Sequence, residues 1–253
     1  MMELKHISAG YPQHPVLEDI SLTFPAGQVT VLVGPNGCGK STLLRVAAGL
    51  MEPERGEVRL DGRNGRDMSR KEFARHVALL PQSRSTPEIP VGALVLHGRF
   101  PYLGYPRRYS AKDRQAAQRA MELTGVLELE RESVSRLSGG QRQKVYLAMA
   151  VAQDTPILLL DEPTTYLDIA HQLELLHLAR TLTGEGKAVV MVLHDLNLAL
   201  TCAHRVVVME SGRLIQVGTP EEVCDSGVLE RVFGVKLRRV EVDGTTQYLF
   251  FRA

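Results

Sequence analysis

The feature that most constrains this chain is a glycine-rich stretch, residues 34–42, which follows the apolar run 29–33 and precedes a predicted helix. The stretch fits the pattern G-x-x-x-x-G-K-[ST], in which glycines let backbone N–H groups turn inward around an anion. Four constrained positions would match by accident in about one chain of this length per hundred. The strand and helix predicted on either side lower that chance, so the pattern predicts a phosphate-binding loop. Its residues are Gly34, Pro35, Asn36, Gly37, Cys38, Gly39, Lys40, Ser41 and Thr42.

The residue types of this loop suit a nucleoside triphosphate with its metal ion. The helix that follows would add the positive end of its dipole to the site. Lys40 would reach the β and γ phosphates, and the hydroxyl of Ser41 can bind Mg²⁺. ATP and Mg²⁺ are therefore the predicted cofactors.

Short apolar runs recur along the chain and predict an α/β fold. They lack strict polar alternation, which is typical of strands buried on both faces of a mostly parallel sheet. A helical pattern, residues 173–182, separates two of them and is followed by glycines. The predicted strands are 29–33, 77–80, 157–160, 188–193 and 206–209.

Polar or glycine-rich residues follow four of these predicted strands. They are the phosphate-binding loop, Gln82, Asp161 with Glu162, and His194 with Asp195. Parallel α/β sheets bind ligands beyond the carboxyl ends of their strands. The four sets are therefore expected at one edge of the sheet, where they can form one site.

Residues 87–154 have a different pattern and predict a helical subdomain inserted into the α/β core. Prolines mark an irregular approach, and helical patterns follow over 112–124 and 139–153. Ser110 with Asp113, and Ser138 with Gln141, have the spacing of a reciprocal helix cap. The core is expected to comprise residues 1–86 and 155–253.

Two acids end the apolar run 157–160. Charged residues commonly end strands, so taken alone Asp161 and Glu162 suggest only an exposed strand end. Beside a phosphate-binding loop, the better interpretation is that Asp161 holds Mg²⁺ through water. Glu162 would then orient and deprotonate the water that attacks the triphosphate.

The residues before the predicted helix 139–153 are similar to the signature of the ABC ATPase family. They lie after the phosphate-binding loop and shortly before the acids, as in that family. Two glycines at a helix start are otherwise unfavourable, because glycine costs about 1 kcal/mol relative to alanine within a helix. Close approach of the backbone to a phosphate would explain them. The signature residues are Leu137, Ser138, Gly139, Gly140 and Gln141.

The resemblance covers essentially the whole chain and implies further site residues. Tyr11 resembles the aromatic residue that stacks on adenine, although alone it would suggest ordinary packing. Gln82 resembles the glutamine that contacts Mg²⁺ and the attacking water. Asp168 resembles an acid that acts across a dimer interface, the alternative being a helix N-cap. His194 resembles the histidine that contacts the γ phosphate, the alternative being a satisfied polar residue at a strand end.

The resemblance also implies the architecture and the partners. The family has a RecA-like core of the P-loop NTPase class, with a mostly parallel sheet, an antiparallel β part near the N-terminus and the helical subdomain, all in one ABC ATPase domain over residues 1–253. Two cassettes pack head to tail in the family, so a second copy of the chain is the expected partner. Integral-membrane permease subunits, and indirectly a periplasmic or surface substrate-binding protein, complete the implied assembly. The implied location is peripheral, on the cytoplasmic face of the cell membrane.

A finer similarity points to importers of iron–siderophore complexes, whose relatives handle haem and cobalamin. The stretches 98–102, 165–172 and 194–199 look like those of their cassettes. The resemblance places these stretches at the catalytic site and at the surface that meets the permease. None of them would contact the cargo, so the cargo is inferred by association. A soluble ABC ATPase acting on DNA or ribosomes is an alternative, but usually carries a long coiled coil or tandem cassettes. A regulatory module without turnover is another, which the presence of Glu162 and His194 disfavours.

The charge balance bears on the choice of partner. Formal net charge is +1, from 30 Lys and Arg against 29 Asp and Glu, without a run of basic residues. Nucleic acid is therefore not an expected partner. The N-terminus lacks a signal-peptide pattern. Three scattered cysteines do not predict a disulfide framework and are expected to be reduced thiols.

Overall fold

The computed structural model describes residues 1–82, 86–242 and 244–252, and its centre is a six-stranded, mostly parallel sheet. Five of the six strands run parallel, and β10 pairs antiparallel with β9 at one edge. These five are the strands predicted from the sequence, with ends that differ by at most one residue. The order across the sheet is β10 (Arg213–Gly218), β9 (Arg205–Glu210), β3 (Val29–Val33), β8 (Ala188–Val192), β7 (Ile157–Asp161) and β6 (Val77–Leu80).

A second sheet is antiparallel and includes the N-terminus, as the resemblance implied. Helix α1 (Lys40–Ala47) lies between the two sheets, where Leu43 and Leu44 are fully buried together with Phe24 and Leu159. This packing holds the start of α1 against the carboxyl end of β3. The antiparallel order is β2 (His14–Phe24), β1 (Met2–Tyr11), β4 (Arg55–Leu60) and β5 (Arg63–Asn64).

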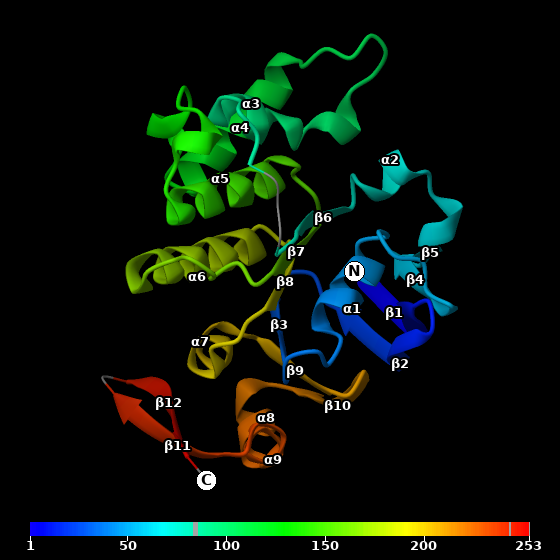
Figure 1. Ribbon diagram of the computed structural model, residues 1–253, viewed down its shortest axis with the longest axis vertical. Helices are drawn as coiled ribbons and strands as arrows, with labels where there is room; N and C mark the ends of the chain where they lie inside the picture. The colour runs from blue at the N-terminus through cyan, green and yellow to red at the C-terminus, as the bar shows by residue number, and fades with distance from the viewer. Residues whose placement is uncertain (83–85, 243, 253) are drawn as a thin grey trace.

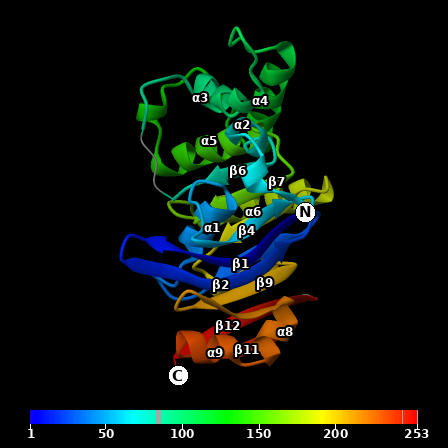
Figure 2. The same ribbon diagram turned by 90° about the vertical axis from the view of Figure 1, so that its right-hand side faces the viewer.

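The chain between β6 and β7 forms a group of helices at one end of the molecule (Figures 1 and 2). Helices α3 and α5 pack so closely that a Cβ on Gly98 would lie 2.2 Å from the carbonyl oxygen of Met149. Only glycine fits there without a shift of the backbone. The helices are α3 (Val91–His97), η2 (Phe100–Tyr102), α4 (Ala111–Leu123), η3 (Leu127–Leu129), η4 (Val134–Arg136) and α5 (Gly139–Ala152).

Arg99 joins these helices at the C-terminal end of α5. Its side chain is buried and pairs with Asp113, with 3.1 Å between Nε and Oδ1. Its Nη1 donates hydrogen bonds to the carbonyl oxygens of Ala152 and Gln153, at 3.0 and 3.2 Å. Because these three contacts join α4 to the C-terminal end of α5, Arg99 is a structural residue of the helical segment.

The remaining elements pack around the two sheets, and two of them form a separate two-stranded sheet at the opposite end of the molecule. A hairpin of β11 and β12 ends the described chain beside α7 (Figure 1). The three cysteines are free, as expected. Among the described residues, no helix combines the length and the apolar character needed to cross a bilayer. These elements are η1 (Gly65–Asp67), α2 (Arg70–Phe73), α6 (Ile169–Gly184), α7 (Leu196–Cys202), α8 (Pro220–Asp225), α9 (Val228–Phe233), β11 (Val235–Val242) and β12 (Thr245–Arg252).

Candidate functional site

The glycine-rich loop connects β3 to α1 and passes close to β9. Gly34, Gly37 and Gly39 all have positive φ angles, of 155°, 78° and 102°. A Cβ on Gly34 would lie 2.2 Å from the carbonyl oxygen of Met209, so the backbone of the loop is held against the sheet. The loop therefore needs glycine both for its turn and for this close approach.

Lys40 begins α1 and its side chain folds back over the loop. Its Nζ donates hydrogen bonds to the carbonyl oxygens of Gly34, at 2.7 Å, and Pro35, at 2.9 Å. The residue is only 6% exposed. The ammonium group is thus held inside the concave side of the loop, where an anion would meet it.

Ser41 and Asp161 bring two oxygen atoms together at the carboxyl ends of β3 and β7. Ser41 Oγ donates a hydrogen bond to Asp161 Oδ1 at 3.0 Å. Burial raises the pKa of the Asp161 carboxyl and the charge of Glu162 adds to the rise, while the hydrogen bond from Ser41 opposes it. A desolvated carboxylate beside a hydroxyl is a donor set of the kind that Mg²⁺ prefers.

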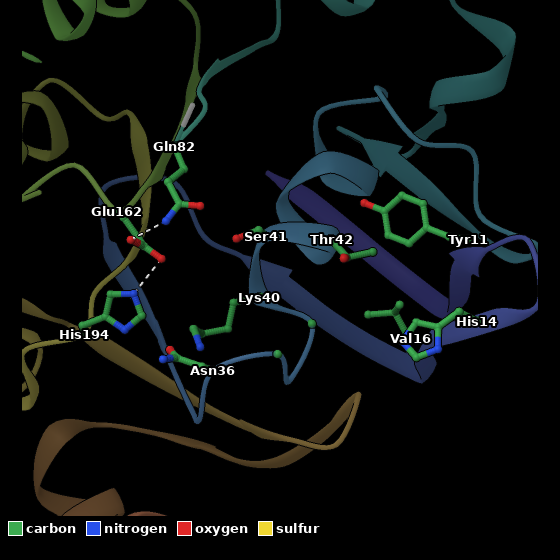
Figure 3. Close-up of a pocket in the computed structure, with 12 residues that line it drawn as sticks. Tyr11, His14, Val16, Asn36, Lys40, Ser41, Thr42, Gln82, Glu162 and His194 are labelled. Carbon is green, nitrogen blue, oxygen red and sulfur yellow. Dashed lines mark hydrogen bonds and ion pairs between the residues drawn. The ribbon is translucent and has the colours of Figure 1, made fainter. Parts of the chain in front are cut away.

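Glu162 lies between two of the other predicted residues (Figure 3). Its Oε2 accepts a hydrogen bond from Gln82 Nε2 at 2.7 Å, and its Oε1 lies 2.6 Å from His194 Nε2. Its backbone has a φ angle of 52°, which is uncommon for a residue with a Cβ. Such strained conformations gather at functional sites, and here the strain places the carboxylate between β6 and β8.

A cavity of about 500 Å³ contains the phosphate-binding loop together with Tyr11, Gln82, Glu162 and His194. Tyr11 is 43% exposed, and its hydroxyl accepts a hydrogen bond from Arg45 at 2.8 Å. His14 and Val16, which the sequence did not single out, also line the cavity. The full lining is Tyr11, His14, Val16, Asn36, Gly37, Gly39, Lys40, Ser41, Thr42, Gln82, Glu162 and His194.

The signature residues and Asp168 do not line this cavity. Ser138 caps α5, with its Oγ accepting a hydrogen bond from the Gln141 backbone and the Gln141 side chain accepting one in return, so the predicted reciprocal cap is confirmed. Asp168 caps α6, where its Oδ1 accepts a hydrogen bond from His171 N at 2.9 Å. Asp168 therefore has the helix N-cap position that was the alternative interpretation of this residue. These residues therefore form a second group, separate from the loop of the same chain.

The start of α5 borders a second hollow, of about 340 Å³, which Gly139 and Tyr166 line. A Cβ on Gly140 would lie 3.3 Å from the carbonyl oxygen of Tyr166, so the loop after β7 packs closely on the signature glycines. Gln143 Nε2 holds the same loop by a 2.8 Å hydrogen bond to the carbonyl oxygen of Pro163. Tyr166 has a φ angle of 69° and is 79% exposed. It lies in the stretch 165–172 that resembles importer cassettes, but it was not predicted as a site residue.

A family model described as "ABC transporter" matches residues 17–165, which is more than half of the chain. The chain belongs to the ABC transporter family. The chain is 45% identical over 231 residues to the probable siderophore transport system ATP-binding protein YusV of Bacillus subtilis, which covers 90% of this chain and 84% of that protein. It is 42% identical over 234 residues to the ferric enterobactin transport ATP-binding protein FepC of Escherichia coli, covering 92% and 86%. This membership makes the chain an ABC ATPase.

Solved structures share the fold over nearly the whole chain. A metal-chelate type ABC transporter in an inward-facing conformation matches with a TM-score of 0.85 and 24% identity, covering 100% of this chain and 96% of the other. A dimeric ATP-binding cassette bound to ADP and Pi matches with a TM-score of 0.78 and 27% identity, covering 87% and 99%. The predicted ABC ATPase fold is thus confirmed.

Proposed function

We propose that this chain is the ATP-hydrolysing subunit of an importer that takes up iron–siderophore complexes through a separate transmembrane permease. The observation that supports hydrolysis best is the position of Glu162. Its carboxylate lies in the cavity of the phosphate-binding loop and contacts both Gln82 and His194. A carboxylate with two polar neighbours, opposite a phosphate-binding loop, suits activation of water for attack on a triphosphate.

Residues 34–42 would bind the phosphates of ATP. The backbone N–H groups of the loop and the start of α1 favour anions, and Lys40 supplies the positive charge for the β and γ phosphates. Tyr11 would stack on adenine at the exposed side of the cavity, with its ring position supported by the Arg45 hydrogen bond. The cavity volume of about 500 Å³ is in the range of small-molecule sites.

Mg²⁺ would be held by Ser41, Asp161 and Gln82. The 3.0 Å contact between Ser41 and Asp161 and the burial of that carboxylate fit a cation of this kind. When bound, the ion would offset negative charge on the phosphate oxygens. Asp161 would act from a fixed position at the end of β7.

Glu162 would accept the proton of the attacking water, while His194 and Gln82 would be its catalytic neighbours. Each of them already contacts one oxygen of the Glu162 carboxylate, which fixes its orientation. His194 would contact the γ phosphate, and Gln82 would orient the attacking water as well as contact the metal. The carboxylate must exchange one of these contacts for the water before it can act as a base.

A second copy of the chain would complete each site. Ser138, Gly139, Gly140 and Gln141 lie outside the cavity of their own chain, which leaves them available to the ATP of a partner. Asp168 would act across the same interface in addition to capping α6. The dimeric ATP-binding cassette described above supports this arrangement. We also propose that residues 87–154 form the helical subdomain and 1–86 with 155–253 the core, apart from the few positions outside the described residues.

The cargo part of the proposal rests on the relatives. Several of them are named for siderophore transport, and the hemin import ATP-binding protein HmuV of Rhodococcus jostii is 41% identical over 93% of this chain. Import of haem or cobalamin is therefore the alternative of the same class. Permease subunits would hold the chain at the cytoplasmic face of the membrane, and a substrate-binding protein would deliver cargo to the permease.

The association of the Glu162→Gln variant tests the proposal. Saturated with Mg-ATP, this variant is expected to dimerise, because the triphosphate stays intact between the two copies. Sizing by light scattering with and without nucleotide measures this. A folded variant that takes up no nucleotide, or that takes it up and remains monomeric, would refute the proposed site.

A further inference from the structure

Residues 100–114, here called the basic–aromatic segment, protrude at one end of the molecule. They run from η2 into α4, at the end opposite to the hairpin of β11 and β12 (Figures 1 and 2). Tyr105 is 100% exposed and Phe100 is 51% exposed. Large aromatic side chains that project into solvent from a connecting segment contribute nothing to the core, so they indicate a surface that meets something else.

All the charged side chains that this segment exposes to solvent are positive. Its single acid, Asp113, is buried and paired with Arg99. Arg107 lies over the ring of Phe100, with 4.9 Å from its Cζ to the ring centre. The exposed bases of the segment are Arg107, Arg108, Lys112 and Arg114. In the described part of the chain, no carboxylate forms an ion pair with any of these four side chains.

Two of these bases stand where helix α4 does not favour them. Lys112 and Arg114 lie in and just after the first turn of α4, near the positive end of the helix dipole. A cation in that position is unfavourable for the helix, whereas an acid would stabilise it. Helix stability therefore does not explain them, and an anionic partner would.

We propose that the basic–aromatic segment contacts the anionic phospholipid surface of the membrane directly. Exposed aromatic rings beside arginine and lysine suit the interface between lipid headgroups and acyl chains. A convex segment that projects from one end can reach a flat surface. The contact goes beyond the proposed function, because it involves neither nucleotide nor permease.

The other end of the molecule provides a matched control. The outer face of the β11–β12 hairpin carries Lys236 and Arg238, paired in register with Phe251 and Leu249. This face, like the basic–aromatic segment, combines bases with large apolar side chains. If residue composition alone determined lipid binding, the hairpin would bind lipid as well as the segment does. We assign the contact to the basic–aromatic segment because it exposes four bases and no acid, whereas the outer face of the hairpin carries two bases.

Sedimentation with vesicles tests the assignment on the full chain. Wild-type protein is expected to bind vesicles of phosphatidylcholine with phosphatidylglycerol at millimolar lipid, and to bind pure phosphatidylcholine far less. The double variant Arg107→Gln, Arg108→Gln is expected to bind about 30-fold more weakly, from roughly fivefold for each base. The control Lys236→Gln, Arg238→Gln should bind as wild type does.

A fluorescent reporter gives a second measurement. The chain contains no tryptophan, so Tyr105→Trp introduces a single probe at a fully exposed position. Its emission is expected to shift to the blue with phosphatidylglycerol vesicles and to remain unchanged with pure phosphatidylcholine. Leu249→Trp, on the hairpin, should show no shift.

The outcomes separate this proposal from the ATPase assignment. The Arg107→Gln, Arg108→Gln variant should hydrolyse ATP in solution as wild type does, since neither residue touches the cavity. Equal vesicle binding by wild type and this variant would overturn the proposal, as would loss of binding in the hairpin control alone. Loss of permease association in detergent with vesicle binding unchanged would also overturn it, because the segment would then recognise protein.

Discussion

Glu162 and His194 are in direct contact, with 2.6 Å between Oε1 and Nε2, although 32 positions separate them in the sequence. The contact exists because β7 and β8 are neighbours in the sheet, so their carboxyl ends lie side by side. Gln82 reaches the same carboxylate from β6, on the other side of β7. The two strands that flank β7 therefore supply two polar groups to the carboxylate that follows β7.

The first prediction concerns the Glu162 carboxylate. Glu162→Gln is expected to retain ATP binding and to lose roughly 10²- to 10⁴-fold in turnover, because an amide cannot accept the proton of the attacking water. Steady-state hydrolysis and nucleotide binding by calorimetry measure the two effects. Glu174→Gln removes an exposed carboxylate that pairs with Lys144 and should hydrolyse ATP normally. Near-normal turnover in Glu162→Gln would refute its role as the base.

The second prediction uses the raised pKa of Asp161. In the folded chain this carboxyl holds its proton more tightly than in the unfolded chain, whose pKa is near the ordinary value of 3.8. Stability of the nucleotide-free protein should therefore fall as pH rises from that value through the raised pKa. Mg²⁺ requires the ionised form, so its affinity should fall as pH is lowered into the same range.

Asp161→Asn separates these effects. Without nucleotide the variant should have a higher Tm than wild type, and the difference should grow as pH rises through the titration range. With ATP, Mg²⁺ should no longer add to the Tm of the variant. Thermal unfolding across acidic to neutral pH provides both readouts, and a Tm difference that does not change with pH would contradict the assigned cause.

The third prediction concerns the close packing of α3 and α5. Gly98→Ala should lower the free energy of unfolding by about 1–3 kcal/mol, since its methyl group would collide with the Met149 carbonyl. Gly104→Ala is the matched control, because nothing lies within 4 Å of its added Cβ. Urea denaturation of both variants measures the difference. Equal stability of the two variants would show that the helices can separate at no cost.

Buried strands were the part of the fold that the sequence predicted best. The run that became β3 has every residue buried, so its apolar pattern was continuous. Helix α4 begins one residue before the predicted range 112–124, and its predicted reciprocal cap of Ser110 with Asp113 is confirmed. The hairpin of β11 and β12 was not predicted, because the adjacent Arg238 and Arg239 interrupt its apolar alternation.

The candidate site was predicted as a list of residues, and its arrangement came from strand order. Polar residues after strands were expected at one edge, but the sequence could not tell that β7 lies between β6 and β8. His14 and Val16 reach the cavity only because the antiparallel sheet packs over the start of α1. Such a placement depends on long-range packing, which leaves no mark in local spacing.

The separation of Ser138 from Lys40 has a genetic consequence. If each nucleotide lies between Lys40 of one chain and Ser138 of another, a dimer holds two sites, and each site is formed by residues of both chains. Pairing a chain that lacks Lys40 with a chain that lacks Ser138 concentrates both defects in one site and leaves the other intact. Two alleles that are inactive when expressed alone should therefore restore activity when expressed together. A dimer made from either allele alone carries the same defect in both sites.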